Sequence, residues 1–292
     1  LNSFNIKIIF LNYLICYCNI IKLKWIISSN HFDLKFYDLK KNMSPDIKFG
    51  IIQRAPVFDY QIKNFFNIFL KGNKKFDLDY YFCFDNSSIQ VLKNYFNANF
   101  VIIGSFQNNC YPIKKTYKDK SILLISCFRP ETLKLKKKRK HYQTDVKHEI
   151  KLTKLLITIC EEQSISFRVL LKPLTKISEY VNLSGINEKY YIFNNGFNNY
   201  STINKFHLII FPNDSTLRPE VVSRKKTFCI IQPLNQLDKA KLGSSCVLNM
   251  NLNYKSLFAL IKSTLNQDYK TFKSKNRNLT QEVLFDEDNN IL

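Results

Sequence analysis

Residues 208–220 read Leu-Ile-Ile-Phe-Pro-Asn-Asp-Ser-Thr-Leu-Arg-Pro-Glu. The four apolar residues that open this stretch are typical of a short strand buried on both faces of a sheet. Polar residues end the strand, and residues 217–224 have the pattern of a helix that follows directly. A buried strand joined by a short turn to a helix is the repeating unit of a parallel α/β fold.

The same alternation of short apolar runs and helix-length segments begins at Leu23 and continues along most of the chain. It predicts strands at Lys24–Ser28, Ile47–Gln53, Tyr80–Phe84, Phe100–Ile103, Ile122–Cys127, Phe167–Leu171, Tyr190–Phe193, Leu208–Phe211, Phe228–Ile231 and Val247–Leu248. It predicts helices at Leu34–Asn42, Tyr60–Leu70, Ser88–Phe96, Tyr142–Glu162, Lys176–Asn182, Ser201–Lys205, Leu217–Arg224 and Tyr254–Leu265. The sequence therefore predicts an α/β protein with two Rossmann-like domains and parallel sheets, the first domain being short at its N-terminal side.

The predicted domain boundaries follow changes in composition. The first domain is expected at 1–107, a Lys-rich linker at 108–120, the second domain at 121–267 and a polar tail at 268–292. The tail is expected either to cross back to the first domain or to fray. Because ligands of open α/β sheets bind beyond the carboxyl ends of the strands, those ends are expected to face a shared cleft.

An apolar stretch near the start, residues 8–27, has two interpretations. It could span a membrane, but Asn12, Asn19, Lys22 and Lys24 interrupt it, and it lacks a small-residue cleavage site. These features favour a helix buried within the first domain that runs into a buried strand.

The chain has 292 residues, is 45% hydrophobic and 23% charged, and carries a formal net charge of +21. This charge leaves two interpretations open: a lysine-rich surface that keeps the protein in solution, or adsorption to the acidic inner face of a membrane. The sequence contains no aromatic-interleaved RNA-binding pattern, zinc finger or phosphate-binding P-loop signature, so nucleic acid is not an expected partner.

The eight cysteines form no CxxC pair, and no histidine lies at zinc-ligand spacing from them. Several lie inside apolar runs, which is typical of buried, reduced thiols. The cysteines therefore indicate a cytoplasmic protein without a disulfide framework or a metal site.

The turn after residue 211 could bind a phosphate. Ser215 or Thr216 could cap the helix that follows, and the free N–H groups of its first turn would then face an anion. Glu220, further along this helix, could accept hydrogen bonds from ribose hydroxyls. The alternative is an ordinary capped helix that binds no ligand.

Three segments resemble one family. Residues 214–217 together with Glu220 match the Asp-Ser-Thr-Leu-Gly-Tyr-Glu that follows a strand in the second domain of bacterial surface-carbohydrate (capsule and lipopolysaccharide) biosynthesis glycosyltransferases. Residues 103–109 are similar to the family's Gly-Ser-Phe-x-Asn-Asn, and residues 124–129 to its strand ending in Ile-Ser-Gln-Phe-Arg. The segments keep the family's order along the chain.

This resemblance implies a GT-B-like fold and the transfer of a sugar from a nucleotide-sugar donor to a surface polysaccharide or a lipid-linked glycan. The first domain would lie on the acceptor side and the second would bind the donor. The resemblance implies that Asp214, Ser215, Thr216 and Glu220 bind the nucleotide sugar, which is a substrate, and that the protein needs no metal or other cofactor. The expected location is the cytoplasm, with peripheral contact at the inner membrane face left open.

The sequence also departs from the family at three places. Arg54-Ala55 stands where relatives have Asn-Gly or His-Gly, Arg218-Pro219 replaces Gly-Tyr, and Ser244-Ser245 lies in place of a Gly-Pro-Phe-Trp-like element. A glycine lets the backbone approach a ligand closely, whereas a larger residue does not. A catalytically degenerate, transferase-like binding protein in surface-carbohydrate biosynthesis is therefore the alternative.

A metal-independent transferase must hold the diphosphate leaving group with cations and place a base at the acceptor hydroxyl. Arg129 and Lys172, each just past a predicted strand of the second domain, are the candidate cations; otherwise they are solvated surface charges. His31 and Asp33, which follow the first predicted strand, are the candidate catalytic bases; otherwise they have structural roles.

Overall fold

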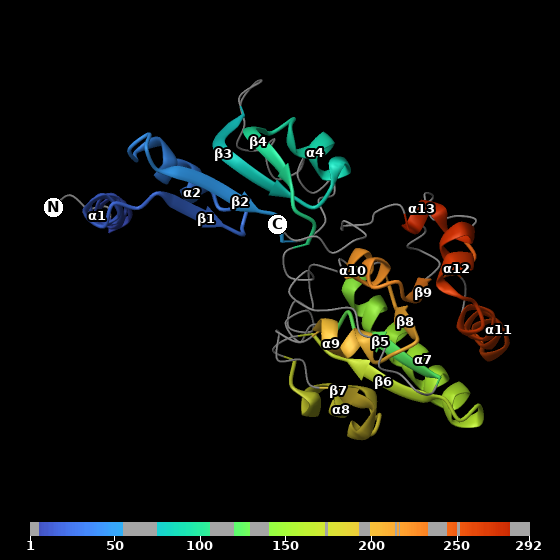
Figure 1. Cartoon of the computed structure of the whole chain (residues 1–292). Helices are drawn as coiled ribbons and strands as arrows, with labels where there is room; N and C mark the ends of the chain where they lie inside the picture. Colours follow the sequence, from blue (N-terminus) through green and yellow to red (C-terminus); the bar gives the residue numbers. More distant parts are fainter. Residues whose placement is uncertain are drawn as a thin grey trace. The chain divides into compact units, whose positions relative to one another are not determined.

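The computed structural model describes residues 6–54, 75–105, 120–128, 140–172, 175–192, 199–213, 215, 217–232, 244–249 and 252–280. These residues belong to two compact units, 6–105 and 120–280. In Figure 1 the first unit is coloured blue to cyan and the second green to red. Both are α/β units built on parallel sheets, which confirms the predicted fold class.

The first unit contains a four-stranded parallel sheet in the order β1-β2-β3-β4. Its strands are β1 (Trp25–Ser28), β2 (Lys48–Ile52), β3 (Phe76–Cys83) and β4 (Phe96–Ile102), and its helices are α1 (Ile6–Ile20), α2 (Leu34–Lys41) and α4 (Asn86–Leu92). A core of aromatic and aliphatic side chains, including Phe36 of α2, Phe49 of β2 and Leu92 of α4, covers one face of this sheet. β1, β2 and α2 lie close to their predicted ranges, whereas β3 and β4 each begin four residues earlier than predicted and α4 ends four residues earlier.

One acidic residue ties the N-terminal end of this sheet together. Asp79 of β3 accepts a hydrogen bond of 2.8 Å from the backbone N–H of Phe49 and pairs with Lys40 of α2. Its second oxygen lies 3.7 Å from the ammonium of Lys48. Burial raises the pKa of Asp79. The hydrogen bonds and the two lysine charges lower this pKa by more than burial raises it, so the net shift is downward.

The second unit contains a six-stranded parallel sheet in the order β10-β9-β8-β5-β6-β7. Its strands are β5 (Ser121–Ile125), β6 (Ser166–Leu170), β7 (Tyr191–Ile192), β8 (Leu208–Phe211), β9 (Thr227–Gln232) and β10 (Val247–Asn249). The chain starts at the centre with β5, moves outward through β6 and β7, and returns to β8 beside β5. It then moves outward on the other side, which is the order of doubly wound nucleotide-binding folds.

Helices cover both faces of this sheet (Figure 1). They are α7 (Lys140–Glu162), α8 (Ile177–Ser184), a 3₁₀ turn (Glu188–Tyr190), α9 (Asn199–Asn204), α10 (Arg218–Ser223), α11 (Tyr254–Leu265), α12 (Tyr269–Lys275) and α13 (Arg277–Thr280). Ile122 and Leu124 of β5 face the core beneath α7 and α11, whereas Leu123 and Ile125 face the core beneath α9, α10, α12 and α13. All of β5, β8 and β9 is buried, as the near-continuous apolar strands predicted.

The structure corrects the expected burial at the start of the chain. The helix and the strand predicted there both form, but Tyr13, Tyr17 and Ile20 of α1 are exposed, as are Trp25 and Ile27 of β1. Hydropathy indicates that a segment can be buried, but it does not say whether the fold provides a surface to cover it. Within the described residues, none of the helices has both the length and the apolar character needed to cross a membrane.

Some predicted features lie partly or wholly outside the described residues. The predicted helix at 60–70 lies wholly outside them, and the predicted linker lies outside them up to residue 119. The first part of the predicted tail forms α12 and α13, whose Phe272 and Leu279 pack into the core of the second unit. Residues 281–292 lie outside the described residues, so the crossing of the tail to the first domain stays a prediction.

Replacing a leucine in the central strand should destabilise the second unit strongly. Leu124→Ala removes a side chain that is fully buried in the core beneath α7, so we expect a loss of about 2 to 5 kcal/mol in the free energy of unfolding. Denaturation followed by circular dichroism measures this loss. Leu183→Ala in α8 makes the same chemical change at a residue that is 39% exposed, and a loss as large there would contradict the assignment of the core.

Candidate functional site

The order of strands in the second unit places a topological switch point at the carboxyl ends of β5 and β8, the position where doubly wound folds bind ligands. The strand order reverses its direction between these two neighbours. As a result, α7 after β5 and α10 after β8 pack on opposite faces of the sheet. The residues that directly follow the two strands are 126–128 and 212–213. Two of the three family-like segments, which are far apart in the sequence, therefore lie at the ends of neighbouring strands.

A buried acid on α7 organises the turn after β5. Glu149 is 1% exposed, and one of its oxygens accepts hydrogen bonds from the Ser126 hydroxyl and, at 2.7 Å, from the Tyr180 hydroxyl. Its other oxygen accepts a hydrogen bond of 2.8 Å from the backbone N–H of Cys127. The Ser126 hydroxyl oxygen in turn accepts a hydrogen bond of 3.1 Å from the N–H of Phe128. Glu149 thereby fixes the backbone immediately before Arg129.

Lys172 is close enough to Glu149 for their charges to interact. It lies half-buried just beyond the end of β6, the strand next to β5. Burial raises the pKa of Glu149, while the hydrogen bonds from Ser126, Tyr180 and Cys127 and the charge of Lys172 lower it, and the net shift is upward. The predicted cation Lys172 thus belongs to the same strand-end cluster as the turn after β5.

Two further side-chain contacts lie at the carboxyl end of β9, the strand on the other side of β8. The Gln232 side-chain amide, at the end of β9, donates a hydrogen bond of 3.0 Å to Oδ1 of Asn213, which follows β8. His148 Nε2 lies 2.9 Å from the carbonyl oxygen of Ile231, and because a carbonyl can only accept, this nitrogen carries the proton. His148 and Glu149 of α7 therefore contact the end of β9 and the turn after β5, at the edge of the sheet where a ligand is expected.

The turn before α10 differs from the expected capped helix. Ser215 Oγ accepts a hydrogen bond of 3.2 Å from the Leu217 N–H, and its carbonyl oxygen accepts one of 2.9 Å from the Arg218 N–H. The helix begins at Arg218, with Leu217 at the cap position and Pro219 in its first turn. Since these N–H groups already have acceptors, α10 has fewer free donors for a phosphate than the sequence suggested. Asp214, Thr216 and Arg129 lie outside the described residues.

The Arg218-Pro219 departure from the family has a structural explanation. Arg218 is 2% exposed, and its guanidinium donates a hydrogen bond of 2.7 Å to the carbonyl oxygen of Leu279 in α13. Proline is well tolerated in the first turn of a helix, where its missing N–H costs little. The arginine that replaces the family's glycine therefore joins α10 to the C-terminal helices.

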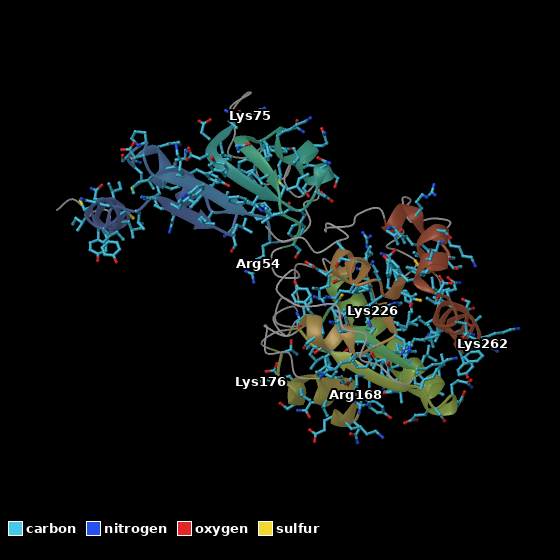
Figure 2. The ribbon with its side chains drawn as sticks, viewed as in Figure 1. Arg54, Lys75, Arg168, Lys176, Lys226 and Lys262 are labelled. Atoms are coloured by element: carbon cyan, nitrogen blue, oxygen red, sulfur yellow. The ribbon has the colours of Figure 1, made fainter. Side chains whose placement is uncertain are left out.

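Glu220 lies inside the second unit rather than at its surface. It is 3% exposed, and its charge raises the pKa of Arg224, although burial lowers that pKa more. Arg224 donates a hydrogen bond of 3.0 Å to Asn204 and lies 4.9 Å from the ring centre of Tyr200. Lys226, which Figure 2 places within the same unit, donates to two backbone carbonyls at the end of α9. Glu220 therefore belongs to a buried polar cluster, and its contact with a ribose stays a prediction.

In the first unit, the two predicted bases lie in the turn between β1 and α2. Asp33 caps α2 by accepting a hydrogen bond of 3.1 Å from the Lys35 N–H. His31 is buried with its ring 4.0 Å from that of Phe32, and this burial lowers its pKa to about 4. The His31 ring is therefore neutral at pH 7, as a base must be, but only weakly basic.

The backbone conformation at Gly104 explains why the family-like segment 103–109 has a glycine there. Gly104, just after β4, has a φ of 65°, a left-handed conformation that favours glycine. At the same edge of the sheet, Gln53 is 1% exposed, donates a hydrogen bond of 3.1 Å to Ser88 and accepts one of 2.8 Å from the Phe84 N–H. Gln53 thus joins the ends of β2 and β3 to the start of α4.

The comparison with protein families identifies the chain. Residues 58–240, more than half of the sequence, match the model of a family described as "putative O-antigen biosynthesis protein". The chain belongs to this O-antigen biosynthesis family. No curated protein matches it.

Solved structures show that this family member has a GT-B-like fold. The protein described as "putative UDP-N-acetylglucosamine 2-epimerase from Listeria monocytogenes" is 10% identical, with a TM-score of 0.55 over 96% of this chain and 75% of that one. The MnaA–UDP structure from Staphylococcus aureus is 11% identical, with a TM-score of 0.54 over 99% and 79%. A variant of the wall teichoic acid polymerase TagF is 12% identical, with a TM-score of 0.54 over 88% and 68%.

Sequence reasoning found some residues of the site in this family member and missed others. It placed Lys172 and the turns after β5 and β8 at what the structure shows to be one edge of one sheet. It missed Glu149 and Gln53. A signal for Glu149 exists, since it shares the buried stripe of α7 with Leu152, Leu156 and Ile159, where an acid is unusual.

Removing the Glu149 carboxylate should destabilise the second unit. Glu149→Ala leaves a buried hydroxyl on Tyr180 and a backbone N–H on Cys127 without their acceptor, so we expect a loss of about 3 to 5 kcal/mol. Equilibrium denaturation measures this loss in the free energy of unfolding. Glu179→Ala is the control: because Glu179 is exposed on α8, its removal should change the free energy of unfolding by no more than about 0.5 kcal/mol. Equal stability of the two variants would contradict the organising role of Glu149.

The stability of the first unit should fall in acid because of His31. Its folded pKa of about 4 lies below the ordinary value of 6.5, so the unfolded chain binds the proton more readily and stability is lost as the pH falls from 6.5 to 4. We expect this histidine to account for roughly 3 kcal/mol over that window. The single tryptophan, Trp25 of β1, reports unfolding of this unit by fluorescence. His31→Gln should show a flatter pH dependence, and an unchanged slope would exclude His31 as its source.

Proposed function

We propose that the protein transfers a sugar from a nucleotide-sugar donor to a surface polysaccharide or lipid-linked glycan. The observation that carries the proposal is that two separate family-like segments lie at the carboxyl ends of the neighbouring strands β5 and β8, where doubly wound folds bind nucleotides. Membership of an O-antigen biosynthesis family supports a glycan acceptor. The S. aureus neighbour with UDP and the teichoic acid polymerase among the neighbours agree with this class of reaction.

In the proposed reaction, an acceptor hydroxyl attacks the anomeric carbon of the donor sugar. The bond between that carbon and the diphosphate oxygen breaks, and a nucleoside diphosphate leaves with the bonding electrons. The negative charge that develops on the diphosphate needs cations and N–H donors. Lys172, half-buried at the end of β6, and Arg129, which follows the turn fixed by Glu149, are the candidates to supply positive charge there.

The proton of the acceptor hydroxyl needs a base. His31 and Asp33 stay our candidates, since both follow β1 at the carboxyl edge of the first sheet. The Asp33 carboxylate has a second oxygen beyond the one that caps α2, and the His31 ring is neutral at pH 7. The reduced cysteines of the described residues agree with a cytoplasmic enzyme that meets its donor there.

A second candidate function is binding of the nucleotide sugar or glycan without turnover. Arg218 favours this function, because it stands in place of the family's glycine and its guanidinium is hydrogen-bonded to α13. The turn before α10 also favours it, because the N–H groups of Leu217 and Arg218 already donate hydrogen bonds to Ser215. Thermal shifts with a panel of UDP-, GDP-, CMP- and CDP-sugars test binding for both candidates. Release of the nucleotide product in the presence of glycan acceptors, a nucleoside diphosphate or, from a CMP-sugar, CMP, separates the enzyme from the binding protein.

Loss of the Lys172 charge should weaken donor binding. A charge-assisted hydrogen bond contributes about 1.5 to 3 kcal/mol, so Lys172→Met should raise the Kd for the donor about tenfold to a hundredfold, measured by titration calorimetry with the sugar nucleotide found in the panel. Lys176→Met is the matched control, since Lys176 is exposed four residues further on (Figure 2). An unchanged Kd for a folded Lys172→Met variant would contradict the assignment of this strand edge as the donor site.

A further inference from the structure

Helix α1 presents an apolar stripe to solvent. Tyr13, Tyr17, Ile20 and, just beyond the helix, Ile21 have exposed fractions of 62%, 48%, 77% and 44%. Their spacing of four, seven and eight residues places them on one face of the helix. The rings of Tyr13 and Tyr17 are stacked with their centres 6.2 Å apart. Exposed apolar surface organised in this way marks a site of contact with a partner.

A basic cavity adjoins the C-terminal end of this stripe. It has a volume of about 520 Å³, and its lining includes Cys18 at the end of α1, Lys22, Lys24, Asp46 and Lys48. Three positive charges therefore face one carboxylate. Lys48 also pairs with Asp79, whereas within the described part of the chain Lys22 and Lys24 form no salt bridge.

An exposed aromatic residue of β1 also lines the cavity. Trp25 lines the cavity, is 41% exposed, and has its ring centre 5.1 Å from that of Tyr80 in β3. Two strand residues further on, Ile27 is exposed on the same face of β1. Tryptophan and tyrosine, with an apolar ring and a polar group, favour the boundary between lipid headgroups and acyl chains.

We propose that α1 and this lysine-lined cavity bind the surface of a membrane that contains acidic phospholipids. The stripe of Tyr13, Tyr17, Ile20 and Ile21 enters the boundary between headgroups and acyl chains, and the lysines bind lipid phosphates.

Charge favours lipid over a second copy of the chain as the partner. A symmetric dimer would place the same patch on both subunits, so each cationic cavity would face its own equivalent. Acidic lipid instead supplies the opposite charge, and each lysine near an anionic surface strengthens binding about fivefold. This inference concerns a surface separate from the proposed donor site and holds whether or not the protein transfers sugar.

The test is co-sedimentation of the full chain with phosphatidylcholine vesicles, with and without phosphatidylglycerol. We expect binding to the vesicles that contain phosphatidylglycerol and weaker binding at high salt. Lys22→Ala/Lys24→Ala should weaken the partition about thirtyfold, and Tyr17→Ser/Ile20→Ser about tenfold or more. Because all four residues are exposed, circular dichroism should show unchanged folding.

The control variant Lys176→Ala/Lys262→Ala removes the same charge from exposed positions of the second unit, which Figure 2 labels. It should keep wild-type binding to the acidic vesicles. Equal weakening of this control and of Lys22→Ala/Lys24→Ala would overturn the proposal, as would equal binding to both kinds of vesicle. A concentration-dependent dimer that Tyr17→Ser/Ile20→Ser abolishes, seen by light scattering without vesicle binding, would assign the stripe to self-association instead.

Discussion

Strands β5 and β8 lie side by side at the centre of the second unit with both faces covered by side chains. In this setting each backbone N–H and C=O must bond to a neighbouring strand, because water is excluded. The parallel register between Ile122 and Leu208 satisfies that requirement and also brings the carboxyl ends of the two strands to the same edge. The switch point at which we place the donor follows from this constraint, since the helices after β5 and β8 pack on opposite faces of the sheet.

The polar side chains at this edge depend on the same burial. Glu149 lies in the apolar stripe of α7, and an unpaired carboxyl there would be costly to bury. The Ser126 and Tyr180 hydroxyls and the Cys127 N–H supply the hydrogen bonds that offset that cost. A rigid turn after β5 is the consequence, and a rigid turn positions the residue that follows it better than a mobile one would. The buried acid is thus a structural element with a direct effect on the proposed site.

Among its described residues, the first unit leaves more large apolar side chains exposed than the second. Its core covers one face of the sheet, while Trp25 and Ile27 of β1 and the stripe of α1 remain accessible. Apolar surface left on a folded unit needs a partner, and lysines beside it limit which partner is favourable. Under our proposals the two units have different roles. The second binds the nucleotide sugar at the carboxyl edge of its sheet, and the first binds the membrane surface through α1.

The sequence by itself determined the α/β class, the order of strands and helices, and the turns after β5 and β8, because periodicity and apolar runs are local properties of the chain. It also determined Lys172 as a residue at a strand end. Only the tertiary structure decided that β8 pairs with β5, that Glu149 lies beneath the turn after β5, and that α10 starts at Arg218 with its first donors already bonded. It also decided that Tyr13, Tyr17 and Ile20 of α1 are exposed rather than buried. These features depend on contacts between residues far apart in sequence, and a side chain's burial is set by the surface that the rest of the fold brings against it.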